Sequence, residues 1–317
     1  MRMLWNKGRW SAGLAVMALW CAAWPPTYGA VDDGDPQLGA NAIVFSSLRS
    51  GNDDIYVTSV GGGGERRLTT ADGQDGAPAV SPDRRTVAFA SVRTGEMQLW
   101  AMDADGEDQR QLLASTSFDF HPAWSHDGGR ILFQRRSATT GFDLWVLDLA
   151  SGAQHQLTSL PRNEVGAFFS PDDQWVVFGG NNGTGQDVWV VPASGGGPVV
   201  LTAGVCIAGT DPCVPAFDGQ PSWTPDGRIL FLSDRAGGIG IWTMAPDGSG
   251  AQEVVDLGGA SAAMPSMSAN GQRIVFTTDV EDLGGQRNVH TVRSDGSQLR
   301  RLTYAGDDLA PGFASGS

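Results

Sequence analysis

A chain of 317 residues, with 44 glycines and only 18% charged residues, is too long for one small domain and ordinary for one large all-β domain. Its formal net charge is −14, and Lys7 is its only lysine. Nucleic acids and anionic membranes bind proteins through clustered cations, so this balance argues against both as partners. The acidic surface permits basic proteins or divalent cations instead.

The first thirty residues differ in composition from the rest of the chain. Arg2, Lys7 and Arg9 make a positive start, and the apolar run AGLAVMALWCAA follows at residues 12–23. This pattern, with small residues at its end, predicts a secretory signal peptide over residues 1–30 rather than a membrane span. Its removal would change the net charge from −14 to −17, because three positive charges leave. We therefore expect a periplasmic or secreted protein that does not span the membrane.

After a predicted linker at residues 31–41, the predicted domain (residues 42–317) repeats one phrase, which reads PAWSHD in its clearest copy. The Ser or Thr of this phrase recurs at steps of 44, 45, 54 and 44 residues. The five copies are centred on Ser81, Ser125, Ser170, Thr224 and Ser268. The long step contains an insertion with Cys206 and Cys213, an even pair that predicts a disulfide in an exported protein.

Each copy of the phrase opens a unit of four predicted β-strands. An apolar run ends in Phe, an aromatic residue or His follows about eleven residues later, and a short segment such as RRLT closes the unit. The first strand carries small residues, as strands crowded around an axis require. The second and third strands are apolar enough to be buried on both faces, and the charged fourth strand suits a solvent-facing edge.

Four such strands describe one blade of a β-propeller. Residues 42–315 number 274, and without the ten-residue insertion they make six units of 44. The first unit lacks an inner strand, and Pro311–Ser315 at the end of the chain supplies one. A single blade cannot bury its faces alone, so the repeats continue until the ring closes. We therefore predict an all-β fold, a six-bladed β-propeller of four-stranded blades, in which the C-terminal strand completes the N-terminal blade.

The units PxWSPDG, IxFxSxRxG, IWxMDxDG and RRLT resemble the TolB-type β-propeller repeat family. The resemblance covers almost the entire predicted mature chain. It implies a propeller fold and a role at the cell envelope, in a complex with lipoprotein or membrane partners. The family's namesake carries an α/β domain before its propeller, whereas about a dozen residues precede the first strand here. We expect a stand-alone propeller of this family.

Carboxylates recur six residues before the central Ser, Thr or Ala of the phrase, where the chain enters the innermost strand. They are Asp75, Asp119, Glu164, Asp218 and Asp308, and Ala262 takes this position in the remaining copy. All these connections lie on one face of the ring, at the mouth of the channel. There the carboxylates would form an acidic collar that attracts Arg or Lys of a partner, or a cation such as Ca²⁺.

A structural interpretation of the collar competes with this one, and we favour it. The loop between the second and third strands opens on the same face. It carries Arg49, Arg93, Arg136 and Arg235. Arg–carboxylate pairs would latch neighbouring loops, and only carboxylates without an arginine would bind a partner. Glu164 and Asp308 are the carboxylates that we expect to be unpaired.

Histidines and aromatic side chains add few further candidates. Of the four histidines, His121 alone has a mouth position, and a structural hydrogen bond to Asp119 would also explain it. We expect His290 to pack in the core, His126 to be solvated and His155 to lie on an outer strand. The aromatic residues in mouth-side loops, which could form an apolar contact surface, are Phe118, Phe120, Phe142 and Phe217.

Catalytic signatures are absent, since the sequence has no HExxH, GxSxG, GKS or GKT motif. We therefore expect no catalytic residue, no metal site and no cofactor, although the collar leaves Ca²⁺ open. The predicted function is that of a non-catalytic, monomeric, exported scaffold that binds a protein, peptide or cell-envelope partner at the channel mouth. The alternative is a metal-assisted carbohydrate lyase or hydrolase that uses the mouth carboxylates.

Overall fold

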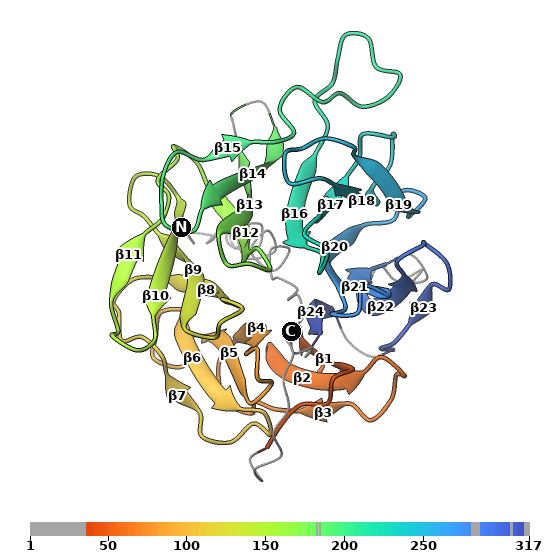
Figure 1. Ribbon diagram of the computed structural model, residues 1–317. Coiled ribbons are helices and arrows are strands. Elements are labelled where there is room, and N and C mark those ends of the chain that lie inside the picture. Colours follow the sequence, from red (N-terminus) through yellow and green to blue (C-terminus); the bar gives the residue numbers. More distant parts are fainter. Residues whose placement is uncertain (1–35, 182, 184, 280–285, 305–306, 314–317) are drawn as a thin grey trace, which may run out of the picture.

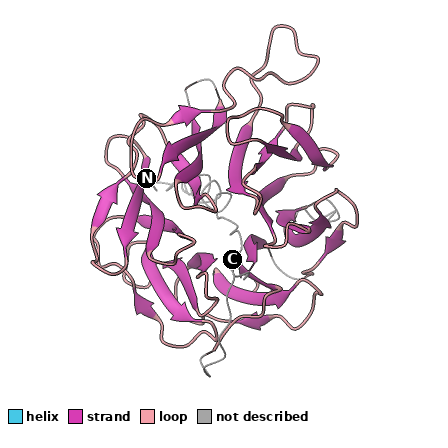
Figure 2. Ribbon diagram, in the orientation of Figure 1, coloured by secondary structure: helices cyan, strands magenta, loops and turns pink. Residues whose placement is uncertain are grey.

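A computed structural model describes residues 36–181, 183, 185–279, 286–304 and 307–313. The described chain forms six four-stranded antiparallel sheets arranged as blades around a central axis (Figure 1). Strands and loops make up all of these residues, with no helix among them (Figure 2). The predicted all-β, six-bladed architecture is confirmed.

The blades are numbered along the chain, and the strands of each run from the channel outward. Blade 1 consists of β24 (Asp308–Phe313), β1 (Ala42–Ser47), β2 (Asp54–Ser59) and β3 (Arg66–Arg67). Blade 2 consists of β4 (Asp75–Val80), β5 (Thr86–Ser91), β6 (Gln98–Asp103) and β7 (Arg110–Gln111). Blade 3 consists of β8 (Asp119–Trp124), β9 (Arg130–Arg136), β10 (Phe142–Asp148) and β11 (Gln154–Gln156). Blade 4 consists of β12 (Glu164–Phe169), β13 (Trp175–Asn181), β14 (Gln186–Pro192) and β15 (Val199–Val200). Blade 5 consists of β16 (Asp218–Trp223), β17 (Ile229–Ser233), β18 (Gly240–Met244) and β19 (Gln252–Asp256). Blade 6 consists of β20 (Ala262–Met267), β21 (Arg273–Thr278), β22 (Asn288–Arg293) and β23 (Arg300–Arg301). Among the six blades, only blade 1 combines strands from the two ends of the described chain, β24 with β1, β2 and β3.

Blade 1 closes the ring because β24 pairs antiparallel with β1. The register places Phe313 opposite Ile43 and Asp308 opposite Ser47. Phe313 and Ile43 are buried in one apolar cluster with Phe45. The strand that completes the first blade therefore comes from the end of the chain, as the repeat count predicts.

The second and third strands of each blade supply most of the core. Along β5 and β21 every residue but the first is buried, as expected for strands covered on both faces. The second-strand phenylalanines that the repeat predicts are all fully buried: Phe45, Phe89, Phe133, Phe178, Phe231 and Phe276. The outer strands are short, and β3 exposes both of its arginines, which suits an edge that must not pair with another chain.

Each inner strand bulges at its third residue, which takes a positive φ beside a shift in register. These residues are Ala77, His121, Gly166, Gln220, Met264 and Ala310, with φ between 49° and 65°. Proline follows all of them except Gly166. Proline lacks the N–H that a ladder needs, and the bulge bends the strand away. Together they keep the edge around the channel from pairing with a further strand.

Part of the predicted linker packs against a blade. Leu38 is buried among apolar side chains of β4 and β5, and its N–H donates to the carbonyl of Arg84 at 3.0 Å. Residues 36–41 are therefore attached to blade 2, next to the blade that they lead into. The predicted signal peptide, residues 1–30, lies outside the described residues.

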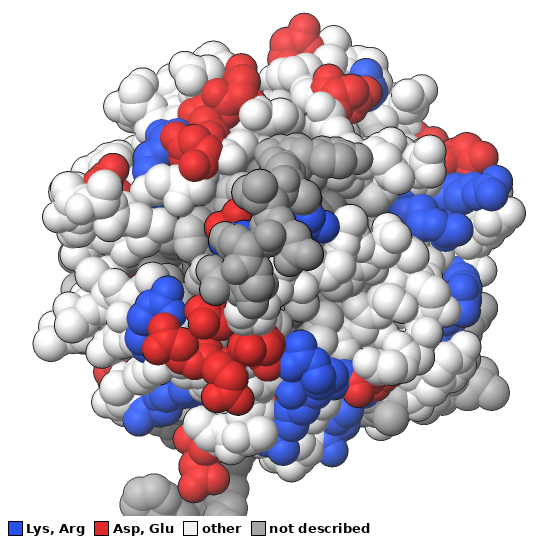
Figure 3. All heavy atoms as spheres, turned by 60° about the horizontal axis from the view of Figure 1, so that its bottom comes forward, with Lys and Arg blue, Asp and Glu red and all other residues white. Residues whose placement is uncertain are grey.

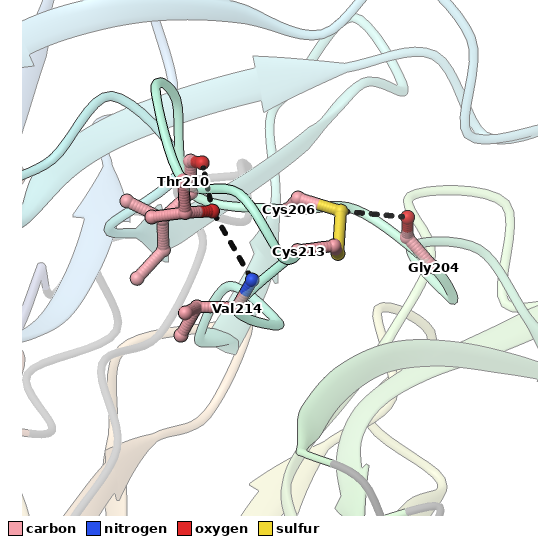
Figure 4. The surroundings of a disulfide bond; sticks show 6 residues. Gly204, Cys206, Thr210, Cys213 and Val214 are labelled. Atoms are coloured by element: carbon pink, nitrogen blue, oxygen red, sulfur yellow. Dashed lines mark hydrogen bonds between the residues drawn. A yellow bond between two sulfur atoms is a disulfide. The ribbon is translucent and has the colours of Figure 1, made fainter.

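The insertion between β15 and β16 extends outward from the ring as a long loop at the top of Figure 1. A short antiparallel bridge joins Cys206 to Pro215, and the predicted disulfide between Cys206 and Cys213 is present (Figure 4). Ala208 N–H donates to the carbonyl of Arg235 at 2.7 Å. The insertion is thus closed on itself and tied to the mouth side of blade 5.

Replacement of both cysteines of the insertion by serine is expected to loosen the insertion and leave the blades intact. Closure of so short a loop stabilises it by about 2–3 kcal/mol in the chain-entropy model, and this stabilisation is local because the disulfide links no two blades. Limited proteolysis should cut the double variant faster within residues 203–217, at an almost unchanged melting temperature. A large drop in melting temperature would contradict this local role.

Candidate functional site at the channel mouth

All five carboxylates of the predicted collar begin an inner strand, and all are buried. They are Asp75 in β4, Asp119 in β8, Glu164 in β12, Asp218 in β16 and Asp308 in β24, each at most 1% exposed. In blade 6 the position belongs to Ala262 of β20. The structure brings the carboxylates to one end of the ring, as predicted, but it buries them there. The collar is therefore not an exposed acidic surface.

Four of the five carboxylates form an ion pair with an arginine of the same blade. The pairs are Asp75–Arg93, Asp119–Arg135, Asp218–Arg235 and Asp308–Arg49, with nitrogen–oxygen distances from 2.6 to 2.8 Å. The arginine side chains are only 14–15% exposed. Loss of one partner would leave a buried charge without compensation, so these contacts, the arginine latches, hold the fold together.

Each latch arginine also lies over two aromatic rings of its own blade. The guanidinium carbon is 4.7 to 5.3 Å from the centroids of the second-strand Phe and the third-strand aromatic ring. In blade 2, for example, Arg93 lies over Phe89 and Trp100. The guanidinium gains cation–π attraction there and shields the carboxylate from water. The repeated aromatic positions therefore serve the latch as well as the core.

Two assignments made from the sequence are wrong. Blade 3 uses Arg135 in its latch, not Arg136, because Arg135 lies directly opposite Asp119 in the ladder between β8 and β9. Arg136 is exposed. Asp308, expected to lack an arginine, is paired with Arg49 through the closure of blade 1.

Hydroxyl groups from the preceding blade also bind two of the latch carboxylates, Asp119 and Asp308. Ser115, which follows blade 2, donates to Asp119 of blade 3 at 2.6 Å. Burial raises the pKa of Asp308, and hydrogen bonds from Thr303 of blade 6 and from Arg49 oppose that rise. Each of these carboxylates therefore joins its own blade to the one before it.

Among the described residues, the groups that bind Glu164 all belong to blade 3. Its oxygens accept bonds from the N–H of Leu144 at 3.3 Å, from the N–H of Leu160 and from the hydroxyl of Thr158. Among the described residues no arginine forms an ion pair with it, as expected from the sequence. Burial raises the pKa of Glu164 to about 7, and the charge of Asp143 adds to the rise against the lowering effect of these bonds.

We expect Glu164 to make the protein less stable as the pH rises from 4.5 to about 7, and Glu164→Gln to remove this loss. Below pH 4.5 the carboxyl is protonated in the folded and the unfolded chain alike. Between 4.5 and about 7 only the unfolded chain ionises freely, so folding loses on the order of 1 kcal/mol per pH unit. Urea unfolding at a series of pH values measures the slope.

Glu107→Gln is the matched control for that experiment, because Glu107 is an exposed carboxylate in a turn of blade 2. The control should keep the slope of the wild-type protein. If Glu164→Gln also keeps it, the carboxyl of Glu164 ionises as readily in the folded chain as in the unfolded one, and the prediction is wrong.

A second group of carboxylates lies at the mouth, where the two ends of the ring meet. Asp53 precedes β2 and Asp307 precedes β24, and both are partly exposed. Burial raises the pKa of Asp53 to about 6, and the charges of Asp54, Asp307 and Asp75 add to the rise. Among the described residues, Asp53 Oδ1 has no hydrogen-bond partner. We call Asp53 and Asp307 the mouth acid patch.

The repeat alignment missed the mouth acid patch for a physical reason. Asp53 and Asp307 lie 254 positions apart, and only the closure of blade 1 brings them together. The signal available in the sequence was the pair of neighbouring carboxylates at each place, Asp53–Asp54 and Asp307–Asp308. Figure 3 shows acidic side chains gathered into patches on the face that it draws, some of them bordered by arginines.

The side chains of Phe118, Phe120 and Phe142 form a cluster at the mouth of blade 3, here called the aromatic ledge. The ring of Phe118 lies 6.2 Å from that of Phe120 and 5.7 Å from that of Phe142. Phe118 and Phe142 are partly exposed, whereas Phe120 is buried at 9%. Phe217 is separate and packs with apolar residues of blades 5 and 6. The structure thus brings together three of the four predicted mouth aromatics.

Two of the four histidines, His121 and His290, are buried in the blades. His121 is 2% exposed, and its ring lies 5.6 Å from that of Phe120. His290 is buried against Phe276, as expected, and His155 lies exposed on β11. The expectation that His126 is solvated is wrong, because Asp173 of blade 4 binds it.

His126 lies in the turn after β8, and its side chain is only 11% exposed. Asp173 of blade 4 reaches across to this turn. It accepts the N–H groups of His126 and Asp127 at 2.8 and 2.9 Å, and it lies 3.2 Å from the imidazole Nδ1. Burial raises the pKa of Asp173, but the bonds from His126 outweigh it and lower the pKa.

The described residues contain neither a cluster of metal-binding side chains nor a membrane-spanning helix. No three His, Cys, Asp or Glu side chains are grouped so that they could hold a metal ion. No helix in this part of the chain is long and apolar enough to cross a membrane.

Comparison with known proteins agrees with the repeat pattern. Residues 36–141 match the family described as TolB beta propeller domain. TolB from Acinetobacter baumannii is similar over 88% of this chain and 68% of its own, with a TM-score of 0.70 and 17% identity. The ring has the fold of the TolB propeller. The resemblance inferred from the repeats is thereby confirmed.

Other similar structures agree with this TolB-type fold. A structure assigned as TolB from Agrobacterium tumefaciens is similar over 87% of this chain and 94% of its own, with a TM-score of 0.68 and 18% identity. An oligogalacturonate lyase in complex with manganese is similar over 83% of this chain and 74% of its own, with a TM-score of 0.58 and 15% identity. At these identities the likeness concerns the fold alone. No curated protein matches the chain by sequence.

Proposed function

We propose that this TolB-type propeller is a non-catalytic exported scaffold, which binds a cationic segment of a protein or peptide partner in the cell envelope at its channel mouth. The mouth acid patch carries the proposal. Burial, and after it the charges of neighbouring carboxylates, raise the pKa of Asp53 to about 6, so its ionised form is short of compensation. An Arg or Lys side chain of a partner would neutralise both Asp53 and Asp307.

The surroundings of the patch support a binding surface. The arginine latches of blades 1 to 3 fix the strand ends on which the patch and the aromatic ledge stand, so a partner would meet a preorganised surface. Partly exposed Phe118 and Phe142 offer apolar contact, and interfaces are enriched in aromatic side chains. The likeness to TolB supports an envelope location and a protein partner.

The alternative of a metal-assisted carbohydrate lyase or hydrolase receives less support. It needs mouth carboxylates that can reach a substrate or a metal ion. Four collar carboxylates are instead buried beneath arginines of their own blades, and Glu164 is turned toward blade 3. The likeness to a lyase with manganese is a likeness of fold.

Retention of envelope proteins by the immobilised mature protein tests the proposal. We expect Asp53→Asn together with Asp307→Asn to lose the retained partner, and high salt to release it from the wild-type protein. Glu107→Gln, which removes an exposed charge in an outer turn of blade 2, should retain the partner. Equal retention by the wild-type protein and the double variant would refute the mouth acid patch as the binding site.

Loss of the partner by the double variant can be distinguished from unfolding of that variant. A carboxyl whose pKa is raised by burial and by neighbouring charges destabilises the folded chain when it is ionised, so Asp53→Asn should preserve or increase the melting temperature at neutral pH. Loss of the partner at an unchanged or higher melting temperature is therefore a loss of binding.

A further inference from the structure

Neighbouring blades pack through the turn between the third and fourth strands, here called the outer turn. In blades 2, 5 and 6 a glycine of this turn lies against a backbone carbonyl of the preceding blade, so closely that a Cβ would come within 3.0 Å of the oxygen. The contacts are Gly106 with Leu68, Gly248 with Leu201 and Gly296 with Val254. Gly62 of blade 1 approaches Leu302 in the same way, at 3.6 Å. Only glycine permits the closest of these approaches.

The seam between blades 3 and 4 lacks this contact. Gly195 takes the same place in its outer turn, where its N–H bonds to the carbonyl three residues back, as in blades 2, 5 and 6. No atom lies within 4 Å of the point where its Cβ would be. A cavity of about 270 Å³ opens at this seam, lined by Gln156–Leu160 of blade 3 and by Gly196 and Pro198 of blade 4. We call it the seam cavity.

The outer turn of blade 3 has a different geometry. Gly152 bonds to a carbonyl four residues back, and it too makes no close approach to the preceding blade. Blade 4 therefore has the outer turn of blades 2, 5 and 6 without its usual contact. The outer turn of blade 4 lies farther from the preceding blade than the outer turns of blades 2, 5 and 6 do.

We propose that the seam cavity is a docking site for a glycine-containing turn of a partner protein. Three other seams of the ring are filled by a turn of this kind, which rests on the carbonyl of the residue that corresponds to Leu157. A partner turn would repeat in trans the contact that those blades make within the chain. The site lies on the outer rim, away from the mouth acid patch, and the proposal does not depend on the function proposed for that patch.

The lining of the seam cavity suits an uncharged turn. It contains no Lys, Arg, Asp or Glu side chain. Gln156, Thr158 and Ser159 offer amide and hydroxyl groups, and Leu160 and Pro198 offer apolar surface. A turn satisfies part of its backbone with its own internal hydrogen bond, so its transfer from water into the cavity costs little free energy. Charged turn tips would lose their hydration without finding an opposite charge.

A peptide copied from the chain itself is the probe. The lining offers no opposite charge, so the probe is a cyclic peptide with the outer turn of blade 5, residues 244–250, in which Asn replaces Asp247. We expect it to shift the amide signals of Gln156–Leu160 and Gly196 in NMR spectra of the protein, with saturation. The same peptide with Ala in place of Gly248 should bind about tenfold more weakly or worse, because its Cβ meets the carbonyl and its φ is strained.

Two protein variants complete the test. Ser159→Trp fills the seam cavity and should abolish the shifts, whereas Gln154→Trp, on exposed β11 outside the cavity, should leave them unchanged. Absence of saturable shifts with the glycine peptide would overturn the proposal. Equal binding of the alanine peptide would also overturn it, and this comparison decides the matter even if Ser159→Trp fails to fold.

Discussion

A chain that ends at Asp307 is expected to lose the folded propeller. The deletion removes β24, the inner strand of blade 1, and exposes the whole edge of β1. Leu309 and Phe313 leave the core, at about 1.5–3 kcal/mol each, and Arg49 loses the carboxylate of its latch, at about 3–5 kcal/mol. These losses are comparable with the whole stability of a typical domain. Circular dichroism and proteolysis should show an unfolded or loosely packed chain.

A permuted chain is the control for this deletion. Phe313 at the end of β24 lies opposite Ile43 near the start of β1, so a turn such as that of residues 224–228 can join the two strands as a hairpin. Placing residues 308–313 and this turn before Ala42 keeps the pairing of β24 with β1 and makes the two strands neighbours in the sequence. We expect the permuted chain to fold. If the truncated chain melts like the wild-type protein, β24 does not close the ring.

The fold could be predicted from the sequence because its information is periodic. A step of 44 residues sets the blade, the charged RRLT segments mark the outer edge, and the unpaired strand at the end of the chain marks the closure. Ring closure then follows from the need of each blade for two neighbours. The bulge with positive φ in every inner strand was not predicted, although the proline that follows five of the six bulges was visible.

The site was less predictable because its contacts depend on register and on closure. The sequence does not distinguish Arg135 from Arg136, since a shift of one residue moves a side chain to the other face of a strand. The paired register of Asp119 with Arg135 decides between them. Asp53 meets Asp307 only through the closed ring. Within the part of the chain that the structure describes, Glu164 has no arginine partner, as expected, but its bonds to blade 3 follow from its side-chain direction, which the repeat does not encode.

Asp119→Asn is expected to destabilise the propeller by about 3–5 kcal/mol, the usual cost of breaking a buried ion pair on one side. Asp119 is completely buried and binds Arg135 through two hydrogen bonds of 2.6 and 2.8 Å. Asparagine keeps the shape of the side chain and creates no cavity, so the loss of stability measures the contribution of the negative charge. Arg135 would remain between Phe133 and Trp145 as a cation without its carboxylate. Chemical unfolding of both proteins measures the difference.

Arg136→Gln and a double variant identify the latch as the cause of that loss. Arg136 is exposed beside Arg135, so its replacement should change stability by less than about 0.5 kcal/mol. Removing both charges of the latch, with Asp119→Asn and Arg135→Gln together, leaves no unpaired ion. The double variant should therefore lose clearly less stability than the sum of its single variants. Strict additivity would mean that the two charges do not interact, and the ion pair would then have no part in holding blade 3 in place.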